Sequence, residues 1–254
     1  MFNAVVIAGG GKPEILTDRE GVNNKAFIKV HGKPLLAYIL AALEDAPSVE
    51  RIIVVGPVKE LEDLRLEGYD FEVVAEKKTS MLDNLAAGLK VIDQDRLSLV
   101  VTGDIPLLKA AVIEDFLTLC SPHDLEFYYP VLTREDCLQR FPEIERTYVS
   151  LKDGYITGGN IGLISASWFL ANRSRLELFI SYRKKPLKLL RILPFSLIFK
   201  YLCKTLTVSD LETSLSKLLK VKARAIFCSC VEIGVDVDKV SDLEVVKKAL
   251  QPQA

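Results

Sequence analysis

Three aspartates and a run of glycines are the residues of this sequence whose positions could do chemistry. Asp104 follows an apolar run that ends at Val101, and it stands two residues before Pro106. Such a run predicts a buried strand, so the carboxylate of Asp104 should lie at the carboxyl end of that strand, where ligands bind in open α/β sheets. A lone carboxylate there is costly unless a metal ion or hydrogen-bond donors compensate its charge. The alternative, that Asp104 only caps the following turn, stays open.

A second pair of acids stands near the end of the chain. Asp236 and Asp238 flank Val237, so on a strand both carboxylates would point to the same face. One of them can bind a metal ion while the other caps the last helix, which we expect to begin at Ser241. The spacing leaves open which aspartate has which role.

The glycine run follows the first apolar run of the chain. It reads Ala8-Gly9-Gly10-Gly11-Lys12 and comes directly after Val5 to Ile7. Glycines at such a place let the backbone approach a ligand closely, and successive amide groups can bind phosphate. The run matches neither Gly-x-Gly-x-x-Gly nor the P-loop pattern. A plain turn is the other interpretation.

Alternating apolar runs and helical patterns predict the elements that position these residues. The first half contains apolar runs at 5–7, 52–55, 71–74 and 97–101 and helical spacing at 34–43 and 80–92. This alternation predicts a doubly wound, mostly parallel α/β sheet. Beyond about residue 125 the order changes to strands at 127–131, 147–151, 155–157 and 161–165, helices at 166–180, 187–203 and 208–220, and a strand at 223–228. The second half should therefore be a mixed sheet with helices.

Composition excludes several classes of protein. The 254 residues include 33 Lys and Arg against 34 Asp and Glu, and 49% are hydrophobic. That hydrophobic content excludes a disordered chain. The nearly neutral net charge argues against a nucleic-acid partner. Five irregularly spaced cysteines and two histidines give no disulfide framework and no zinc site, which favours reduced thiols and a cytoplasmic location. The amino terminus lacks the pattern of a signal peptide and reads as the first strand.

Taken together and in order, these motifs resemble the nucleotidyltransferase superfamily, in particular the molybdenum-cofactor guanylyltransferase-like NTP transferases. The resemblance covers about 1–120 and 223–250 and is carried by the glycine run, Lys25 before a short strand, Gly32-Lys33-Pro34, Gly103-Asp104-Ile105-Pro106 and Asp236-Val237-Asp238. It implies one Rossmann-like domain over 1–254. Its nucleotide-binding half would be 1–120, and its acceptor half 121–254 would contain a basic, apolar helical insertion at about 166–220.

The resemblance also implies an activity. It is the metal-dependent transfer of a nucleoside monophosphate from a nucleoside triphosphate to a phosphorylated or hydroxyl acceptor, with release of pyrophosphate. Mg²⁺ or Mn²⁺ would be held by Asp104 and by Asp238, which motif matching favours slightly over Asp236. Lys25 and Asp104 would be catalytic. The nucleotide would contact Ala8, Gly9, Gly10, Gly11, Lys25 and Ser80. Ser80 fits a plain helix cap equally well.

The second half of the superfamily fold receives the acceptor. Here it contains Gly158-Gly159-Asn160, in which the paired glycines would expose backbone amides and Asn160 offers both a donor and an acceptor. These three residues are therefore our candidates for acceptor binding. A tightly turned strand entry is the alternative.

A basic, apolar segment suggests where a lipid could enter. From Arg173 to Lys204 the chain has nine basic residues and one acid, Glu177, a local net charge of +8. Its cations and Pro194 argue against a membrane span. Residues 183–204 could instead contact an anionic membrane at the inner face of the cell and serve a lipid-linked acceptor. A lid that packs on its own domain, with a small-molecule acceptor, is the alternative.

The chain also departs from the superfamily. Pro13 and Glu14 stand where an arginine usually follows the glycine run, and Lys12 or Arg19 would have to supply that charge.

Two other functions remain open. A glycosyltransferase that uses a nucleotide-sugar would need Asp-x-Asp at Gly103-Asp104-Ile105-Pro106, where only one acid is present. A non-catalytic nucleotide-binding protein is favoured by the missing arginine.

Overall fold

The computed structural model describes residues 1–9, 15–77, 80–183 and 194–251, and for 178–183 it describes the backbone alone. Its first half alternates strands with helices. The elements are β1 (Phe2–Ile7), α1 (Ile15–Glu20), the 3-10 helix η1 (Lys25–Phe27), β2 (Lys29–Val30), β3 (Lys33–Pro34), α2 (Leu35–Glu44), β4 (Val49–Gly56), α3 (Val58–Leu66), β5 (Glu72–Ala75), α4 (Met81–Leu89), β6 (Leu97–Thr102) and α5 (Ala110–Leu119).

The second half adds short strands and then a run of helices. The elements are β7 (Phe127–Thr133), α6 (Arg134–Arg140), β8 (Val149–Leu151), β9 (Gly154–Gly158), β10 (Ile161–Ser165), α7 (Ala166–Arg183), α9 (Phe195–Leu202), α10 (Val208–Leu219), β11 (Ala223–Phe227), the 3-10 helix η2 (Val231–Gly234) and α11 (Val240–Ala249). None of the helices in the described ranges is both long and apolar enough to cross a bilayer.

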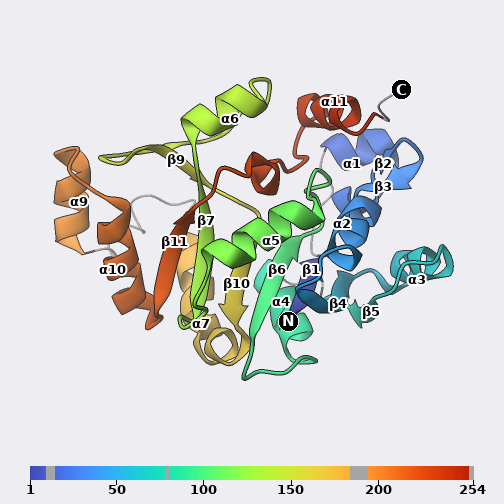
Figure 1. The fold of residues 1–254 in the computed structure, drawn as a ribbon, viewed down its shortest axis with the longest axis horizontal. Coiled ribbons are helices and arrows are strands. Elements are labelled where there is room, and N and C mark those ends of the chain that lie inside the picture. The colour runs from blue at the N-terminus through green and yellow to red at the C-terminus, as the bar shows by residue number, and fades with distance from the viewer. Residues whose placement is uncertain (10–14, 78–79, 184–193, 252–254) are drawn as a thin grey trace.

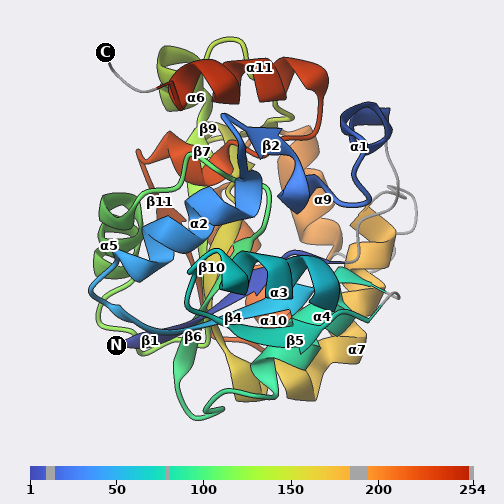
Figure 2. The ribbon, with the colours of Figure 1, turned by 90° about the vertical axis from the view of Figure 1, so that its right-hand side faces the viewer.

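One sheet joins both halves, with helices on its two faces (Figure 1). The strand order is β5-β4-β1-β6-β10-β7-β9-β8, and β11 pairs with β7. The helices α2 and α5 cover one face, while α4 and α7 cover the other (Figure 2). This is the doubly wound, mostly parallel α/β fold that the sequence predicts.

The central strand β1 is apolar from Ala4 to Ile7 because it is covered from both faces. Ala4 and Val6 pack into the core beneath α2 and α5, whereas Val5 and Ile7 pack beneath α4 and α7. The strand pairs in parallel with β4 on one side and β6 on the other. The carboxyl ends of β1 and β6 therefore meet at one edge of the sheet.

The second half departs from parallel pairing at β10. This strand is antiparallel to both β6 and β7, and β7, β9 and β8 continue as antiparallel neighbours. The start of β10 thus lies at the same sheet edge as the end of β6. Asn160, which precedes β10, is brought there in consequence.

Two details of the sequence prediction are wrong or incomplete. Residues 235–238 do not form a strand on which Asp236 and Asp238 would share a face; they are an irregular segment between η2 and α11. The amide of Val237 bonds to Asp104, not to a neighbouring strand. The predicted helix at 187–203 is described only from Phe195, because 184–193 lie outside the described residues.

Candidate functional site

The aspartates that the motifs single out converge at the carboxyl edge of the sheet. Asp104 follows β6, and Asp236 and Asp238 lie between η2 and α11. One carboxylate oxygen from each lies within 4.8 Å of the corresponding oxygens of the other two. Segments separated by more than half of the chain therefore build a single acidic cluster.

Backbone contacts fix the position of the cluster. The amide of Val237 donates to the carbonyl oxygen of Asp104 at 3.0 Å, so the two motifs are joined directly. The amide of Gly103 donates to the carbonyl oxygen of Ile7 at 2.9 Å. A Cβ at Gly103 would lie 3.0 Å from that oxygen, tighter than an ordinary contact, so a glycine favours the close approach of β6 to the end of β1.

Lys25 lies among the acids. Its Nζ forms an ion pair with Oδ1 of Asp238 and another, at 3.5 Å, with Oδ2 of Asp104. Asn24 holds η1 in place, because its side chain accepts from the amide of Ala26 and donates to the carbonyl oxygen of Ala8 at 2.7 Å. The end of β1 thereby positions the lysine that precedes the short strand β2.

Arg146 is a member of the site to which sequence reasoning gave no role. Its side chain is 8% exposed, and Nη2 lies 3.6 Å from Oδ1 of Asp236 and donates to the carbonyl oxygen of Gly234. Its Nη1 is buried against Gly234 with no hydrogen-bond partner among the described residues. Arg146 thus balances part of the negative charge at Asp236, whereas Lys25 contacts Asp104 and Asp238.

The electrostatics of the cluster fit a hard divalent cation. Burial, followed by the negative charges of Asp104 and Asp238, raises the pKa of Asp236 to about 6. Oδ1 of Asp104 is buried and has no hydrogen-bond partner within the described residues. A buried carboxylate oxygen without a donor, in a group of three carboxylates, suits a cation that takes oxygen ligands.

The predicted nucleotide residues are only partly described. Gly10 and Gly11 lie outside the described residues, while Gly9 lies beside Glu76, so that a Cβ on Gly9 would come within 2.8 Å of the Glu76 Cβ. Ala8 is buried and its amide donates to Val55 at 2.9 Å. Ser80 is the N-cap of α4, because its hydroxyl accepts from the amide of Asp83 at 3.1 Å. A helix cap accounts for this serine without a ligand.

Of the predicted acceptor residues, Asn160 lies at the sheet edge where the cluster forms, but the amide of Gly159 is not exposed as expected. The amide of Gly159 donates to the carbonyl oxygen of Pro130 at 3.1 Å, and Gly158 pairs with Val131 in the sheet. The amide of Gly159 is therefore already engaged. Both glycines allow close packing against β7, because a Cβ at Gly158 would collide with Tyr129 and one at Gly159 would meet Pro130. Asn160 does reach the site: its Nδ2 donates to the carbonyl oxygen of Gly234 at 3.4 Å.

Lys12 and Arg19 are the residues predicted to replace the charge of the missing arginine. Lys12, with Pro13 and Glu14, lies outside the described residues. Arg19 lies on α1 with a side chain 58% exposed, and its ion pair is with the adjacent Glu20 at 3.9 Å. Within the described parts of the chain, Arg146 is the arginine that contacts the aspartates.

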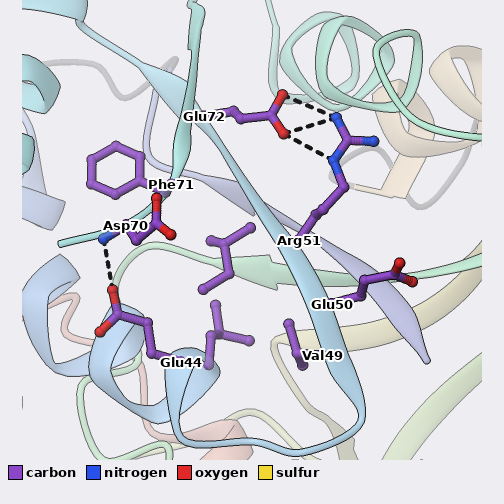
Figure 3. Close-up of a pocket in the computed structure, with 9 residues that line it drawn as sticks. Glu44, Val49, Glu50, Arg51, Asp70, Phe71 and Glu72 are labelled. Carbon is purple, nitrogen blue, oxygen red and sulfur yellow. Dashed lines mark hydrogen bonds and ion pairs between the residues drawn. The ribbon is translucent and has the colours of Figure 1, made fainter.

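A different hollow, of about 370 Å³, lies at the opposite edge of the sheet (Figure 3). It is formed at the starts of β4 and β5, and two pairs of its polar residues contact each other. Arg51 pairs with Glu72, and the carboxylate of Glu44 accepts from the amide of Asp70 at 2.8 Å. This hollow is separate from the aspartate cluster, which lies at the strands' carboxyl ends.

The sequence and fold match known proteins. The family model described as the MobA-like NTP transferase domain matches residues 4–178. A probable molybdenum cofactor guanylyltransferase of Thermococcus kodakarensis is 32% identical over 114 residues, which are 45% of this chain and 51% of that protein. A 2-C-methyl-D-erythritol 4-phosphate cytidylyltransferase of Halalkalibacterium halodurans is 28% identical over 137 residues, or 52% of this chain and 59% of that protein. The chain thus spans about half the length of these curated relatives.

A solved structure matches over a greater length. A hypothetical transferase from Thermus thermophilus is 30% identical and superimposes with a TM-score of 0.83, over 96% of this chain and 100% of that one. Nearly the whole chain therefore has a counterpart of known structure.

Proposed function

This chain belongs to the MobA-like NTP transferase family, and from that membership we propose that it transfers a nucleoside monophosphate from a nucleoside triphosphate to an acceptor. An acceptor oxygen attacks the α-phosphorus, the bond from that phosphorus to the bridging oxygen breaks, and pyrophosphate leaves. The single observation that carries this proposal is the convergence of Asp104, Asp236 and Asp238 at the carboxyl edge of the sheet. Ligands bind at that edge in doubly wound folds.

Asp104, Asp236 and Asp238 are the residues that would hold Mg²⁺ or Mn²⁺ in this proposal. When bound, such a cation neutralises charge on phosphate oxygens. Asp104 has the buried oxygen that lacks a donor, and Asp238 is the most exposed of the three, with 56% of its side chain accessible. The three acids would therefore form a site that is open on the side of Asp238.

Lys25 supplies a positive charge on a rigid support. Its Nζ contacts both Asp104 and Asp238, and its backbone belongs to η1, which Asn24 anchors to the end of β1. An ammonium group there stabilises negative charge that develops on phosphate oxygens as pyrophosphate leaves. The residues of this chain thus act mainly by orientation and by charge stabilisation, and no covalent enzyme intermediate is needed.

The test is pyrophosphate release from each of the four common nucleoside triphosphates, with Mg²⁺ and a panel of phosphorylated and hydroxyl acceptors. We expect release that depends on one triphosphate, on an acceptor and on Asp104. An Asp104→Asn variant should retain the melting behaviour of the metal-free protein and lose turnover. Saturable triphosphate binding without turnover on any acceptor would favour the non-catalytic alternative. Cleavage of a nucleotide-sugar in place of a triphosphate would favour a glycosyltransferase.

Contact with an anionic membrane is a second proposal, for the location of the acceptor. Phe195, Phe199 and Leu202 of α9 are 79%, 57% and 73% exposed, although residues 184–193 of the basic segment lie outside the described residues. Apolar side chains beside a net charge of +8 suit an anionic bilayer surface. We expect co-sedimentation with anionic vesicles and its loss in a Phe195→Ser/Phe199→Ser variant. Absence of sedimentation by the parent protein would refute the proposal.

A further inference from the structure

A hydrophobic pocket of about 260 Å³ lies beneath α10, over the strands β7, β9 and β11. Its lining residues are hydrophobic apart from Thr157, Gly158, Glu212 and Arg224, and we call it the α10 pocket. We propose that this pocket binds one alkyl chain of a lipid. The proposal goes beyond the transfer reaction and does not depend on it.

The pocket exists because α10 is buried at its two ends and not in its middle. Val208 and Leu219, near the two ends, are 7% and 8% exposed. Leu211 and Leu215 lie between them, are only partly buried and line the pocket. Val208 belongs to a hydrophobic cluster around Val131, whereas Leu219 belongs to the core beneath α4 and α7. The pocket is the space between these two clusters.

Small side chains on β11 form the floor of this space. The strand pairs in parallel with β7, so that Ala223 lies beside Phe127 and Ala225 lies beside Tyr129. Positions two residues apart on a strand share a face, and all four of these residues line the pocket. A larger side chain at either alanine would therefore fill the pocket.

The charged residues of the lining do not serve a polar ligand. The Oε1 atom of Glu212 accepts from the amide of Ala225 and is thus already engaged. Arg224 alternates with Ala225, so its side chain points to the opposite face of the sheet, where Ile226 joins the core beneath α5. A peptide or a sugar in the pocket would bury polar groups without partners, which is costly. An alkyl chain has no such groups.

The size of the pocket suits a chain of moderate length. An apolar cavity of about 150 Å³ binds benzene, which has six carbon atoms. By the same proportion, the volume of about 260 Å³ holds a chain of roughly ten carbon atoms. The pocket therefore accommodates a large part of one lipid chain and not a whole lipid.

The helix next to α10 presents an apolar surface to the outside. The helices α9 and α10 lie side by side at the outer end of the sheet, next to β11 (Figure 1), and both contribute to one hydrophobic cluster. Phe195 and Leu202 of α9 are 79% and 73% exposed. The pair of helices that covers the pocket thus also carries side chains that favour contact with lipid chains.

Trp168 allows a direct test, because it is the single tryptophan of the chain and lies next to the pocket. Its ring stacks on that of Phe127, with 6.3 Å between the ring centroids. Bromine quenches tryptophan fluorescence on close approach. The probes are straight-chain alcohols with a terminal bromine, from bromobutanol to bromodecanol, added in EDTA without nucleotide. We expect saturable quenching and a Kd that falls about fourfold for each added methylene.

Two variants fill the pocket from opposite sides. In Ala225→Leu and in Leu215→Phe, the Kd for bromodecanol should rise at least about tenfold, while the melting temperature should equal or exceed that of the parent. Thr213→Leu is the matched control, because it adds a leucine to an exposed position of α10 outside the lining. It should bind bromodecanol as the parent does. Either filling variant tests the pocket if the other fails to fold.

The source of the chain is tested with phosphatidylglycerol vesicles whose acyl chains carry bromine. They should quench Trp168 in the parent and in Thr213→Leu more strongly than in the filling variants. Quenching by bromodecanol without quenching by these vesicles would overturn the lipid as the ligand. No saturable quenching by bromodecanol, or an equal Kd in the filling variants and the control, would overturn the pocket itself. A second copy of the chain on the pocket would give dimers in sedimentation and no quenching, which would also contradict the proposal.

Discussion

The amide of Val237 donates a 3.0 Å hydrogen bond to the carbonyl oxygen of Asp104. This bond joins the end of β6 to the segment before α11, and it brings the carboxylates on either side of Val237 to the carboxylate of Asp104. The acidic cluster is thus a consequence of main-chain pairing, which is less easily displaced than a contact between flexible side chains. Side-chain substitutions in the cluster should change its charge and leave its position largely intact.

The pH dependence of stability should reflect the burial of Asp236 and its repulsion by the neighbouring aspartates. Because the pKa of Asp236 is raised to about 6 from an ordinary value of 3.8, the folded state takes up a proton at a higher pH than the unfolded state. The resulting stabilisation is fully present below about pH 4 and is lost as the pH rises through about 6. In EDTA, the melting temperature of the parent relative to Asp236→Asn should therefore increase from pH 7 to pH 5.

Protonation of Asp236 should weaken the binding of a divalent cation. Mg²⁺ binds the ionised carboxylates, so its stabilising effect on the parent should be larger at pH 7.5 than at pH 5. Thermal melts with EDTA and with Mg²⁺ at both values measure this difference. Parallel pH profiles for the parent and Asp236→Asn would show that Asp236 does not titrate in this range.

Removal of the Lys25 charge should leave Asp104 and Asp238 without the cation that contacts both of them. Lys25→Met deletes the ammonium that contacts both Asp104 and Asp238, so the metal-free protein should melt at a lower temperature than the parent. Turnover should fall by about 10²- to 10³-fold, the effect of losing one group that stabilises developing charge. Lys29→Met, an exposed lysine on β2, is the control and should behave as the parent. Similar turnover in both variants would remove Lys25 from the proposed mechanism.

Gly234 should be intolerant of any side chain. A Cβ at this position would collide with the guanidinium of Arg146 and with Leu132, so Gly234→Ala should displace Arg146 and destabilise the fold by about 1–3 kcal/mol. Gly162→Ala is the matched comparison, because its Cβ would meet its nearest neighbours at 3.4 Å. Chemical denaturation measures the free energy of unfolding of both variants. An unchanged free energy of unfolding for Gly234→Ala would show that Arg146 is not held as described.

Much of the fold could be predicted because its signals are local. The apolar run of β1 is continuous since Val5 and Val6 face opposite covered sides of the sheet, and this continuity is itself the sign of a buried parallel strand. The helix α6 was missed, although its signal is local as well. Thr133 accepts from the amide of Asp136 at 3.1 Å, a cap that the spacing of these two residues offers in the sequence.

The site was predictable only where a motif marked it. Asp104 could be assigned to a strand end from its own neighbours. Its proximity to Asp236 and Asp238 was indicated by family resemblance and not by periodicity. Arg146 had no such mark, because its partner Gly234 is 88 residues away and no spacing rule links them. The roles of Gly158 and Gly159 were misjudged since a glycine pair indicates close approach equally to a ligand or to another strand.

The most direct test of the account is a titration of the purified protein with Mn²⁺, followed by electron paramagnetic resonance. The parent should bind the ion saturably, whereas Asp104→Asn should lose ordered binding and keep its fold by circular dichroism. Asp70→Asn, an exposed acid at the opposite edge of the sheet, should bind Mn²⁺ as the parent does. Equal Mn²⁺ binding by the parent and by Asp104→Asn would contradict the claim that the three converging aspartates hold a divalent cation.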